Sequence, residues 1–112
     1  QETGQGPVLL YPVKRERLTM PLFRVPNDDV VYLFDILRTA PPDPNVIAAM
    51  VQSNRELFER VRDLGGNRYA IGAIPFSQKD WKQHFRTVWG QLVSAKRRYD
   101  PDNVLTPGQG IF

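Results

Sequence analysis

The sequence predicts a small α+β domain in which helices cover one face of a largely antiparallel sheet. Three observations support this class. Short runs of β-branched and aromatic residues are separated from longer segments of helical periodicity, capping residues and glycines mark the helix ends, and the connections between strands are long and are not helical crossovers. The expected order is strand, strand, helix, strand, helix and an irregular tail.

Two strands are expected in the first third of the chain. Residues 8–13 form a short apolar run, and the charged, Pro-punctuated residues 14–27 that follow it predict a loop. Residues 30–37 are rich in strand formers and stop before Pro41 and Pro42, so we interpret them as a strand, although their spacing also fits a helix.

The next segments alternate between helix and strand. Apolar residues recur three and four apart over 45–64, which predicts an amphipathic helix with Asn45 as its N-cap and Gly65-Gly66 as its end. The alternating residues 68–74 predict a third strand. Ser77 and Asp80 predict the start of a last helix, by a capping box. That helix extends to Asp100-Pro101 along one apolar stripe: Trp81, Phe85, Val88, Leu92, Ala95 and Tyr99.

The composition is that of one ordinary domain. The 112 residues are 41% hydrophobic and 24% charged, with a net charge of +3 that does not favour nucleic acid as a partner. No cysteine is present, which excludes disulfides, thiolate nucleophiles and Cys-based zinc sites. No apolar run approaches the roughly 20 residues of a membrane helix, so no membrane partner is expected. The first residue is not Met, and we expect the chain to be a piece of a longer protein.

The residues of common active sites are missing from the sequence. His84 is the single histidine, and we interpret it as a partly buried helix residue, since one imidazole cannot build a His-rich metal site. No nucleophile elbow or Gly-rich phosphate loop appears in the required strand–turn–helix context. We therefore expect no metal site and no complete catalytic centre within these residues.

The last fourteen residues carry the clearest functional signal. Pro101 and Pro107 exclude a helix, yet the tail ends in the apolar pair Ile111-Phe112. Chain ends fray unless they are tied down, so a shaped, apolar tail indicates a loop that lies on another surface. Gln109 is the one long polar residue near its tip, and such a group needs a partner wherever the loop is buried.

Several motifs, in this order along the chain, resemble the C-terminal part of cytokinin dehydrogenase, a flavoenzyme family of the vanillyl-alcohol-oxidase type. They are Gly6-Pro-Val-Leu-Leu-Tyr-Pro12, Asp29-Val-x-Tyr-x-x-x-x-Leu37, Asn54-Arg-x-Leu57, Asp80-Trp-x-x-His-Phe85 and Tyr99-Asp-Pro-x-x-x-Leu-x-Pro-Gly-Gln-x-Ile-Phe112. The Asp-Pro-x-x-x-Leu-x-Pro-Gly ending is shared among many flavin oxidases, and the first and last motifs together are more specific.

The resemblance implies a FAD-dependent oxidoreductase that oxidises the C–N bond of a secondary amine by hydride transfer to the flavin. Residues 1–98 would belong to the substrate domain, and residues 99–112 would return to an upstream FAD domain of the same protein. Gln109 would contact the flavin, and four residues would line the pocket of an adenine-type cytokinin or another apolar aromatic amine or alcohol: Pro7, Leu9, Leu37 and Ala73. A flat apolar slot with few polar groups suits such a substrate.

The sequence departs from the family at one place and leaves two other functions open. Where the family has a flavin-contacting Tyr and then an apolar residue, this chain has Ile71-Gly72-Ala73, which would open the pocket. The catalytic carboxylate and the flavin-linking His of the family match no residue here, so the segment alone is expected to be inactive. A related flavin enzyme that acts on an alcohol or sugar, or a stand-alone α+β interaction module, would also fit the residues. Without the FAD domain, the tail is expected to be disordered or docked on a substitute surface.

Overall fold

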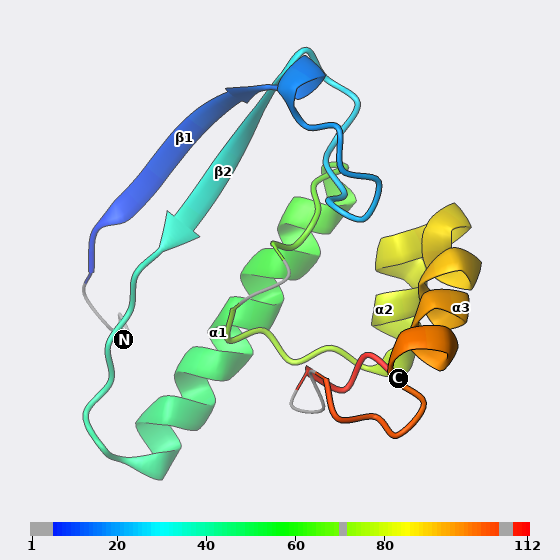
Figure 1. Ribbon diagram of the computed structural model, residues 1–112. Helices are drawn as coiled ribbons and strands as arrows, with labels where there is room; N and C mark the ends of the chain where they lie inside the picture. The colour runs from blue at the N-terminus through cyan, green and yellow to red at the C-terminus, as the bar shows by residue number, and fades with distance from the viewer. Residues whose placement is uncertain (1–5, 70–71, 106–108) are drawn as a thin grey trace. The chain divides into compact units, whose positions relative to one another are not determined.

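The computed structural model describes residues 6–69, 72–105 and 109–112 (Figure 1). The chain forms two units, the first from Gln1–Thr19 and Val25–Pro75 and the second from Met20–Arg24 and Phe76–Phe112. The first contains a two-stranded antiparallel sheet and a long helix, and the described residues of the second form short helices, the tail and the irregular Met20–Arg24. The predicted α+β class is confirmed.

The sheet is a hairpin of β1 (Val8–Lys14) and β2 (Val30–Ile36). Its register pairs Val8 with Ile36 at one end and Lys14 with Val30 at the other, and the Leu37 amide extends it by donating to the Pro7 carbonyl oxygen at 3.1 Å. Both strands lie where the sequence predicts them. The predicted loop after β1 begins with a turn of 3-10 helix at Arg15–Arg17.

Pro12 fits inside β1 because of this register. The hydrogen-bonded pair of Pro7 and Leu37 makes positions 7, 9, 11 and 13 the hydrogen-bonding ones, since the two kinds of pair alternate along an antiparallel ladder. Pro12 lies at a non-hydrogen-bonding position, opposite Tyr32, where its missing N–H breaks no ladder bond. A proline at an odd-numbered position nearby would remove one.

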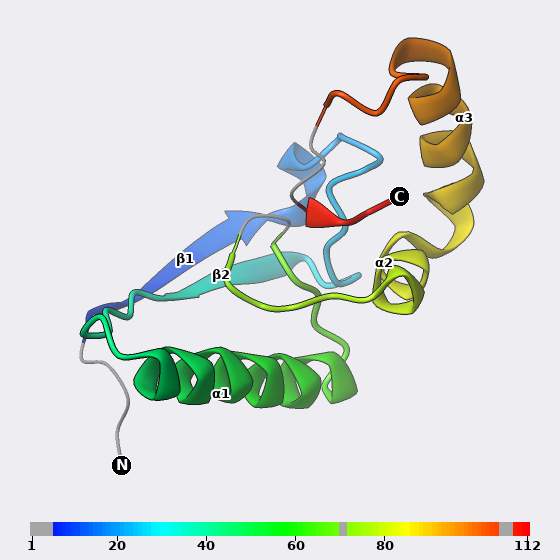
Figure 2. The ribbon, with the colours of Figure 1, turned by 90° about the horizontal axis from the view of Figure 1, so that it is seen from below.

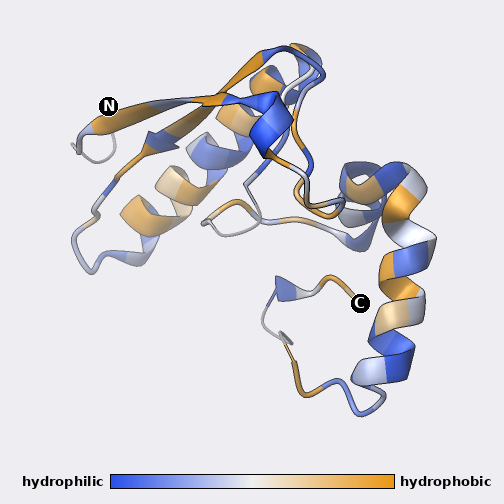
Figure 3. Ribbon diagram, turned by 45° about the horizontal axis from the view of Figure 1, so that its top comes forward, coloured by the Kyte–Doolittle hydropathy of each residue, from blue (hydrophilic) through white to orange (hydrophobic). Residues whose placement is uncertain are grey.

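Helix α1 (Pro44–Asp63) runs beside the hairpin (Figure 2). In Figure 3 much of both strands is hydrophobic, whereas α1 carries both hydrophobic and hydrophilic patches along its length, as expected of an amphipathic helix. Its most buried side chains are Met50 and Phe58. The guanidinium carbons of Arg55 and Arg62 lie 5.6 and 5.7 Å from the centre of the Phe58 ring and shield it from solvent.

The ends of α1 agree with the prediction except for the identity of its N-cap. Asp43 rather than Asn45 caps the helix, because its carboxylate accepts the amides of Asn45 and Val46 at 2.8 and 3.4 Å while Pro44 occupies the first helical position. At the other end, the amides of Gly65 and Gly66 donate to Arg62 and Val61, which forms a Schellman motif. Gly65 has φ +86°, so the predicted glycine signal is confirmed.

The predicted third strand is not continuous in the described part of its segment. Arg68, Tyr69 and residues 72–74 are irregular there, and Ala70 and Ile71 lie outside the described residues. The Arg68 side chain is buried and donates to the Gly72 carbonyl oxygen at 3.0 Å, and burial lowers its pKa. The Arg68 side chain therefore holds this segment, where the hydrogen bonds of a β-ladder were expected.

In the second unit the predicted last helix is divided. Helix α2 (Gln78–Phe85) begins with the predicted capping box of Ser77 and Asp80, and α3 (Trp89–Tyr99) ends where expected. Between them a turn of 3-10 helix, Arg86–Val88, replaces the continuous helix. Arg86 has φ +44°, and Thr87, Val88, Trp89 and Gly90, which follow it, are all weaker helix formers than Ala, Leu or Arg. The apolar stripe alone did not reveal this break.

The conformation of Arg86 leads to a stability prediction. A non-glycine residue at positive φ costs about 1–3 kcal/mol, so Arg86→Gly is expected to raise the free energy of unfolding by about 1 kcal/mol after the added entropy of the unfolded chain. Arg97→Gly is the matched control, because the same change at an exposed position in the last turn of α3 should lower the free energy of unfolding by up to about 1 kcal/mol. Urea unfolding measures both, and destabilisation by the two changes alike would contradict the prediction.

Candidate functional site

Three of the four predicted pocket residues lie at one end of the hairpin and on one face of it. Pro7 pairs with Leu37 through the 3.1 Å hydrogen bond, and Leu9 pairs with Asp35 two residues further along. Side chains two residues apart on a strand point to the same side of a sheet. Pro7 and Leu37 are exposed and Leu9 is half-buried, so the three offer an apolar surface with Asp35 as its polar neighbour.

The glycine of the Gly-Pro motif has a structural reason at this end of the hairpin. A Cβ atom on Gly6 would overlap the backbone carbonyl of Leu37. Gly6 therefore lets the chain before Pro7 approach the end of β2 closely. The motif shapes the same place where Pro7 and Leu37 meet.

The fourth predicted pocket residue, Ala73, is tied to α1 through Asn54. The Asn54 side chain donates from Nδ2 to the Ala73 carbonyl oxygen at 3.1 Å and accepts from Nη1 of Arg38 at 3.0 Å. Arg38 directly follows Leu37, so a single amide connects the chain at Leu37 with the chain at Ala73. The structure thus brings the fourth residue into the same hydrogen-bond network as the end of β2.

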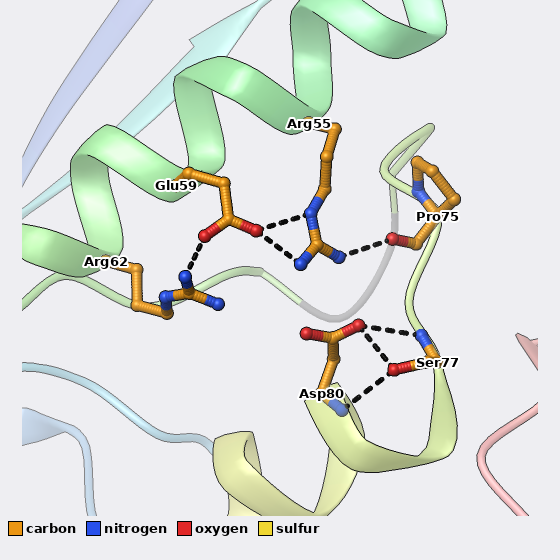
Figure 4. A network of polar contacts seen from close by, with 6 residues as sticks. All are labelled: Arg55, Glu59, Arg62, Pro75, Ser77 and Asp80. Atoms are coloured by element: carbon orange, nitrogen blue, oxygen red, sulfur yellow. Dashed lines mark hydrogen bonds and ion pairs between the residues drawn. The ribbon is translucent and has the colours of Figure 1, made fainter.

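A second contact from α1 holds the same irregular segment two residues later. Arg55 donates from Nη1 to the Pro75 carbonyl oxygen at 2.9 Å, and its Nε donates to Glu59 Oε1 at 2.6 Å (Figure 4). Glu59 also pairs with Arg62 through its other oxygen. The carboxylate therefore fixes both guanidinium groups, and Arg55 is held in the direction of the loop.

In the second unit an aromatic cluster surrounds Trp81, whose side chain is completely buried. Its ring stacks on Phe85 at 5.9 Å and meets Phe76 and His84 edge-on at 4.8 and 5.9 Å between ring centroids. The indole Nε1–H donates to the backbone carbonyl oxygen of Gln109 at 3.1 Å. The buried aromatic side chain therefore fixes the backbone of the residue predicted to contact flavin.

Asp100 organises the start of the tail. One oxygen of its buried carboxylate accepts the Val104 amide at 2.8 Å, and the other accepts the Leu105 amide at 2.9 Å and pairs with the Lys96 ammonium group. Lys96 also donates to the Leu105 carbonyl oxygen at 3.0 Å. The hydrogen bond from Lys96 is the main reason that the pKa of Asp100 lies below its usual range; the two amides contribute and burial opposes them.

The end of the tail packs on the helices of its own unit. The Phe112 ring stacks on Trp89 at 5.8 Å, and Lys96 Nζ lies 5.3 Å from its centre. Residues 109–112 therefore lie against the helices of their own unit, while Thr106, Pro107 and Gly108 lie outside the described residues. The Gln109 side chain is exposed. A fixed backbone with an exposed carboxamide fits a group that gives or accepts one hydrogen bond at a flavin edge.

The remaining candidate has a packing role. His84 lies on α2, as expected of a helix residue, but it is buried rather than partly buried. Its ring lies edge-on to Phe85 at 4.8 Å and to Phe76 at 6.2 Å. Within residues 6–69, 72–105 and 109–112, no three His, Asp or Glu side chains are grouped so that they could hold a metal ion. None of the helices described is both long and apolar enough to span a membrane.

A protein-family model described as "Cytokinin dehydrogenase 1, FAD and cytokinin binding" matches residues 1–112. The chain belongs to this family. The resemblance drawn from the sequence motifs is confirmed, and so is the expectation of FAD as the cofactor of the family.

Relatives of this cytokinin dehydrogenase family segment occur in bacteria and plants. An uncharacterized oxidoreductase, ORF5 in the fasciation locus of Rhodococcoides fascians, is 41% identical over 105 residues, which cover 94% of this chain and 24% of the relative. Cytokinin dehydrogenase 3 of Arabidopsis thaliana is 36% identical over 110 residues, 96% of this chain and 20% of the relative. Cytokinin dehydrogenase 8 of Oryza sativa subsp. indica is 35% identical over 120 residues, 96% of this chain and 23% of the relative. The chain spans about a quarter or less of their length.

Sequence reasoning assigned no role to three residues that shape this cytokinin dehydrogenase segment, namely Arg38, Asn54 and Asp100, although Asn54 and Asp100 lie in the motifs that carry the resemblance. Asn54 had a signal, because it lies four residues from both Met50 and Phe58 on the buried side of α1, where a polar side chain needs partners. Asp100 had one too, since an Asp that directly follows a helix can accept the amides of the next turn. Arg38 carried none.

Proposed function

We propose that this chain is the C-terminal segment of a FAD-dependent oxidoreductase that oxidises the C–N bond of a secondary amine. Membership of the cytokinin dehydrogenase family supports the enzyme class and the cofactor. The relatives are four to five times longer than the aligned segment, which supports an upstream FAD domain as the partner of this segment in the same protein. Residues 1–98 would form part of the substrate domain and residues 99–112 would return to the FAD domain.

The observation that carries this proposal is the arrangement of the four predicted pocket residues. Pro7 and Leu37 form a ladder pair, Leu9 lies on the same face, and Asn54 links the carbonyl of Ala73 to Arg38 beside Leu37. Residues that are more than sixty positions apart thus belong to one local structure. An exposed, mainly apolar surface of this kind suits the flat ring of an adenine-type cytokinin or another aromatic amine.

Gln109 is the residue that would contact the cofactor. Trp81 holds its backbone by the 3.1 Å hydrogen bond, and its carboxamide extends from an exposed position. When bound, FAD supplies the acceptor for the hydride that leaves the substrate carbon. The role of Gln109 is to orient and hydrogen-bond the ring edge, while the pocket residues exclude water from one side of the substrate.

The other two functions make different predictions about the full-length protein. A relative that acts on an alcohol or sugar would hold flavin but leave adenine-type secondary amines unoxidised. A stand-alone interaction module would show no flavin absorbance. An absorption spectrum of the purified full-length protein, followed by anaerobic mixing with amine and alcohol substrates, separates the three, and bleaching of the flavin band by the amine is the expected result.

Gln109→Ala in the full-length enzyme is expected to slow flavin reduction about 2- to 10-fold, because one polar contact contributes about 0.5–1.5 kcal/mol net. Stopped-flow absorbance at the flavin band measures the rate. Gln91→Ala, the same change on the exposed side of α3, is the matched control and should leave the rate unchanged. Equal rates for the Gln109 variant and the unaltered enzyme would rule out the flavin contact.

A further inference from the structure

We infer that Asn54 and Arg38 set the distance between the Leu37 end of β2 and the segment at Ala73, and so determine how large a substrate side group the pocket accepts. This inference rests on the proposed function. The bonds that carry it join three segments far apart in the sequence: Arg38 Nη1 to Asn54 Oδ1 at 3.0 Å, and Asn54 Nδ2 to the Ala73 carbonyl oxygen at 3.1 Å.

The chemistry of the side chains leaves one orientation for the Asn54 amide. A guanidinium group can only donate and a carbonyl oxygen can only accept, so the amide oxygen must face Arg38 and the amide nitrogen must face Ala73. The same Nη1 of Arg38 also donates to Ser53 Oγ at 3.1 Å, which fixes the guanidinium group over α1. Asn54 is thus held on one side and holds the Ala73 backbone on the other.

The small size of Gly72 and Ala73 makes the hydrogen bond from Asn54 important for the pocket. Gly72 and Ala73 carry no side chain that could swing into or out of a pocket, so the position of their backbone alone decides where that wall lies. The hydrogen bond from Asn54 acts on the Ala73 carbonyl itself. A bond that fixes the backbone of a wall made of small residues also fixes the width of the pocket.

The location of Asn54 on α1 supports a positioning role. Asn54 lies one turn from both Met50 and Phe58, whose side chains are 9% and 8% exposed. An amide on this stripe costs free energy unless both of its ends are hydrogen-bonded. An apolar residue would fill the same place without the cost of burying an amide, but it could not link Arg38 to the Ala73 carbonyl oxygen.

The test uses Asn54→Asp in the full-length, flavin-loaded enzyme. Aspartate has the shape of asparagine and still accepts from Arg38, but it replaces the donor toward Ala73 with an oxygen that repels the carbonyl. Kinetics are measured with two adenine derivatives that are secondary amines. The exocyclic amino nitrogen carries an isoprenoid group in one and a short alkyl group in the other. We expect the ratio of kcat/KM for the two substrates to change about tenfold, mainly through KM, because a displaced wall alters binding of the side group.

Two further variants and one structural readout accompany this measurement. Gln52→Glu is the matched control, since it makes the same amide-to-acid change on the exposed side of α1, where Gln52 bonds Glu56 at 3.1 Å. Arg38→Gln disturbs the other half of the link and should change the substrate ratio in the same direction. Hydrogen exchange of the amides at 72–74 should accelerate in Asn54→Asp and not in Gln52→Glu, while the flavin spectrum stays unchanged.

The outcomes separate this inference from the proposed function. Faster exchange at 72–74 together with a changed substrate ratio supports it. Faster exchange with an unchanged ratio overturns it and leaves Asn54 a purely structural residue. Unaltered exchange also overturns it. If the protein without substitutions holds no flavin, or oxidises neither amine, the proposed function is wrong. This inference, which rests on it, is then wrong as well.

Discussion

Replacing Trp81 by alanine is expected to lower the free energy of unfolding by about 3–5 kcal/mol, the typical cost of deleting a large buried aromatic side chain. Trp81 is fully buried, and its ring contacts Phe76, His84 and Phe85 at once. The loss is large compared with the 5–15 kcal/mol that stabilises an ordinary domain. We therefore expect α2 and α3 to lose most of their protection from hydrogen exchange.

The second tryptophan provides the comparison. Trp89 is half-buried and its ring stacks on Phe112, so Trp89→Ala removes an aromatic residue of the same kind with less buried area. It should lower the free energy of unfolding clearly less than Trp81→Ala does, as measured by urea unfolding followed by circular dichroism. Equal losses for both variants would mean that the core of this unit is not centred on Trp81.

Trp81→Phe separates packing from hydrogen bonding. Phenylalanine keeps an aromatic ring in the cluster but cannot donate to the Gln109 carbonyl oxygen, which lies 3.1 Å from the indole nitrogen. The tail should then loosen while the helices stay folded, and hydrogen exchange at the Gly110 amide reports this loosening. If Gln109 orients flavin, the rate of flavin reduction should fall in the same variant, and the two effects should not add in a Trp81→Phe, Gln109→Ala double variant.

The hairpin shows how far the sequence leads and where tertiary contacts take over. β-branched and aromatic residues predicted both strands, because such side chains fit a pleated surface wherever the strand lies. The register depends on which backbone groups meet, and it became visible only with the 3.1 Å bond from Leu37 to Pro7. That pairing explains why Pro12 is tolerated and why Pro7, Leu9 and Leu37 share a face.

Helix ends and side-chain networks were less predictable. The Gly65-Gly66 signal is local, and it was correct. The N-cap was placed at Asn45 because asparagine is a good capping residue. The structure has Asp43 as the N-cap, with Pro44 at the first helical position. The link from Arg38 through Asn54 to Ala73 depends on contacts between distant segments, which periodicity does not contain. The apolar stripe continues across the break at Arg86, so periodicity did not reveal that break either.

Acid is expected to release the tail through Asp100. The pKa of Asp100 is lowered in the folded protein, chiefly by the hydrogen bond from Lys96. A carboxyl group whose pKa is lowered on folding stabilises the folded state above its unfolded pKa of about 3.9, and this contribution disappears as the pH falls through the folded value. The bonds to the Val104 and Leu105 amides should therefore weaken only below about pH 4.

Asp100→Asn tests the same group at neutral pH. Asparagine has one acceptor oxygen where Asp100 uses two, and it loses the charge that pairs with Lys96. Hydrogen exchange at Val104 and Leu105 should accelerate at least about tenfold, because hydrogen bonds to a charged carboxylate are the stronger class. Asp102→Asn is the matched control, since Asp102 lies two residues away on the exposed side of the same turn.

The acid titration and the Asp100→Asn variant can be combined to test whether Asp100 itself holds the tail. Trp89 fluorescence reports the stacked Phe112 ring, so it should change between pH 5 and pH 2 in the unaltered protein and in Asp102→Asn. In Asp100→Asn the tail is already released, and this acid transition should be absent. A transition of full size in Asp100→Asn would assign the pH dependence to other carboxylates. Absence of the transition from this variant alone would show that one buried carboxylate holds the tail on α3 and keeps Gln109 in place.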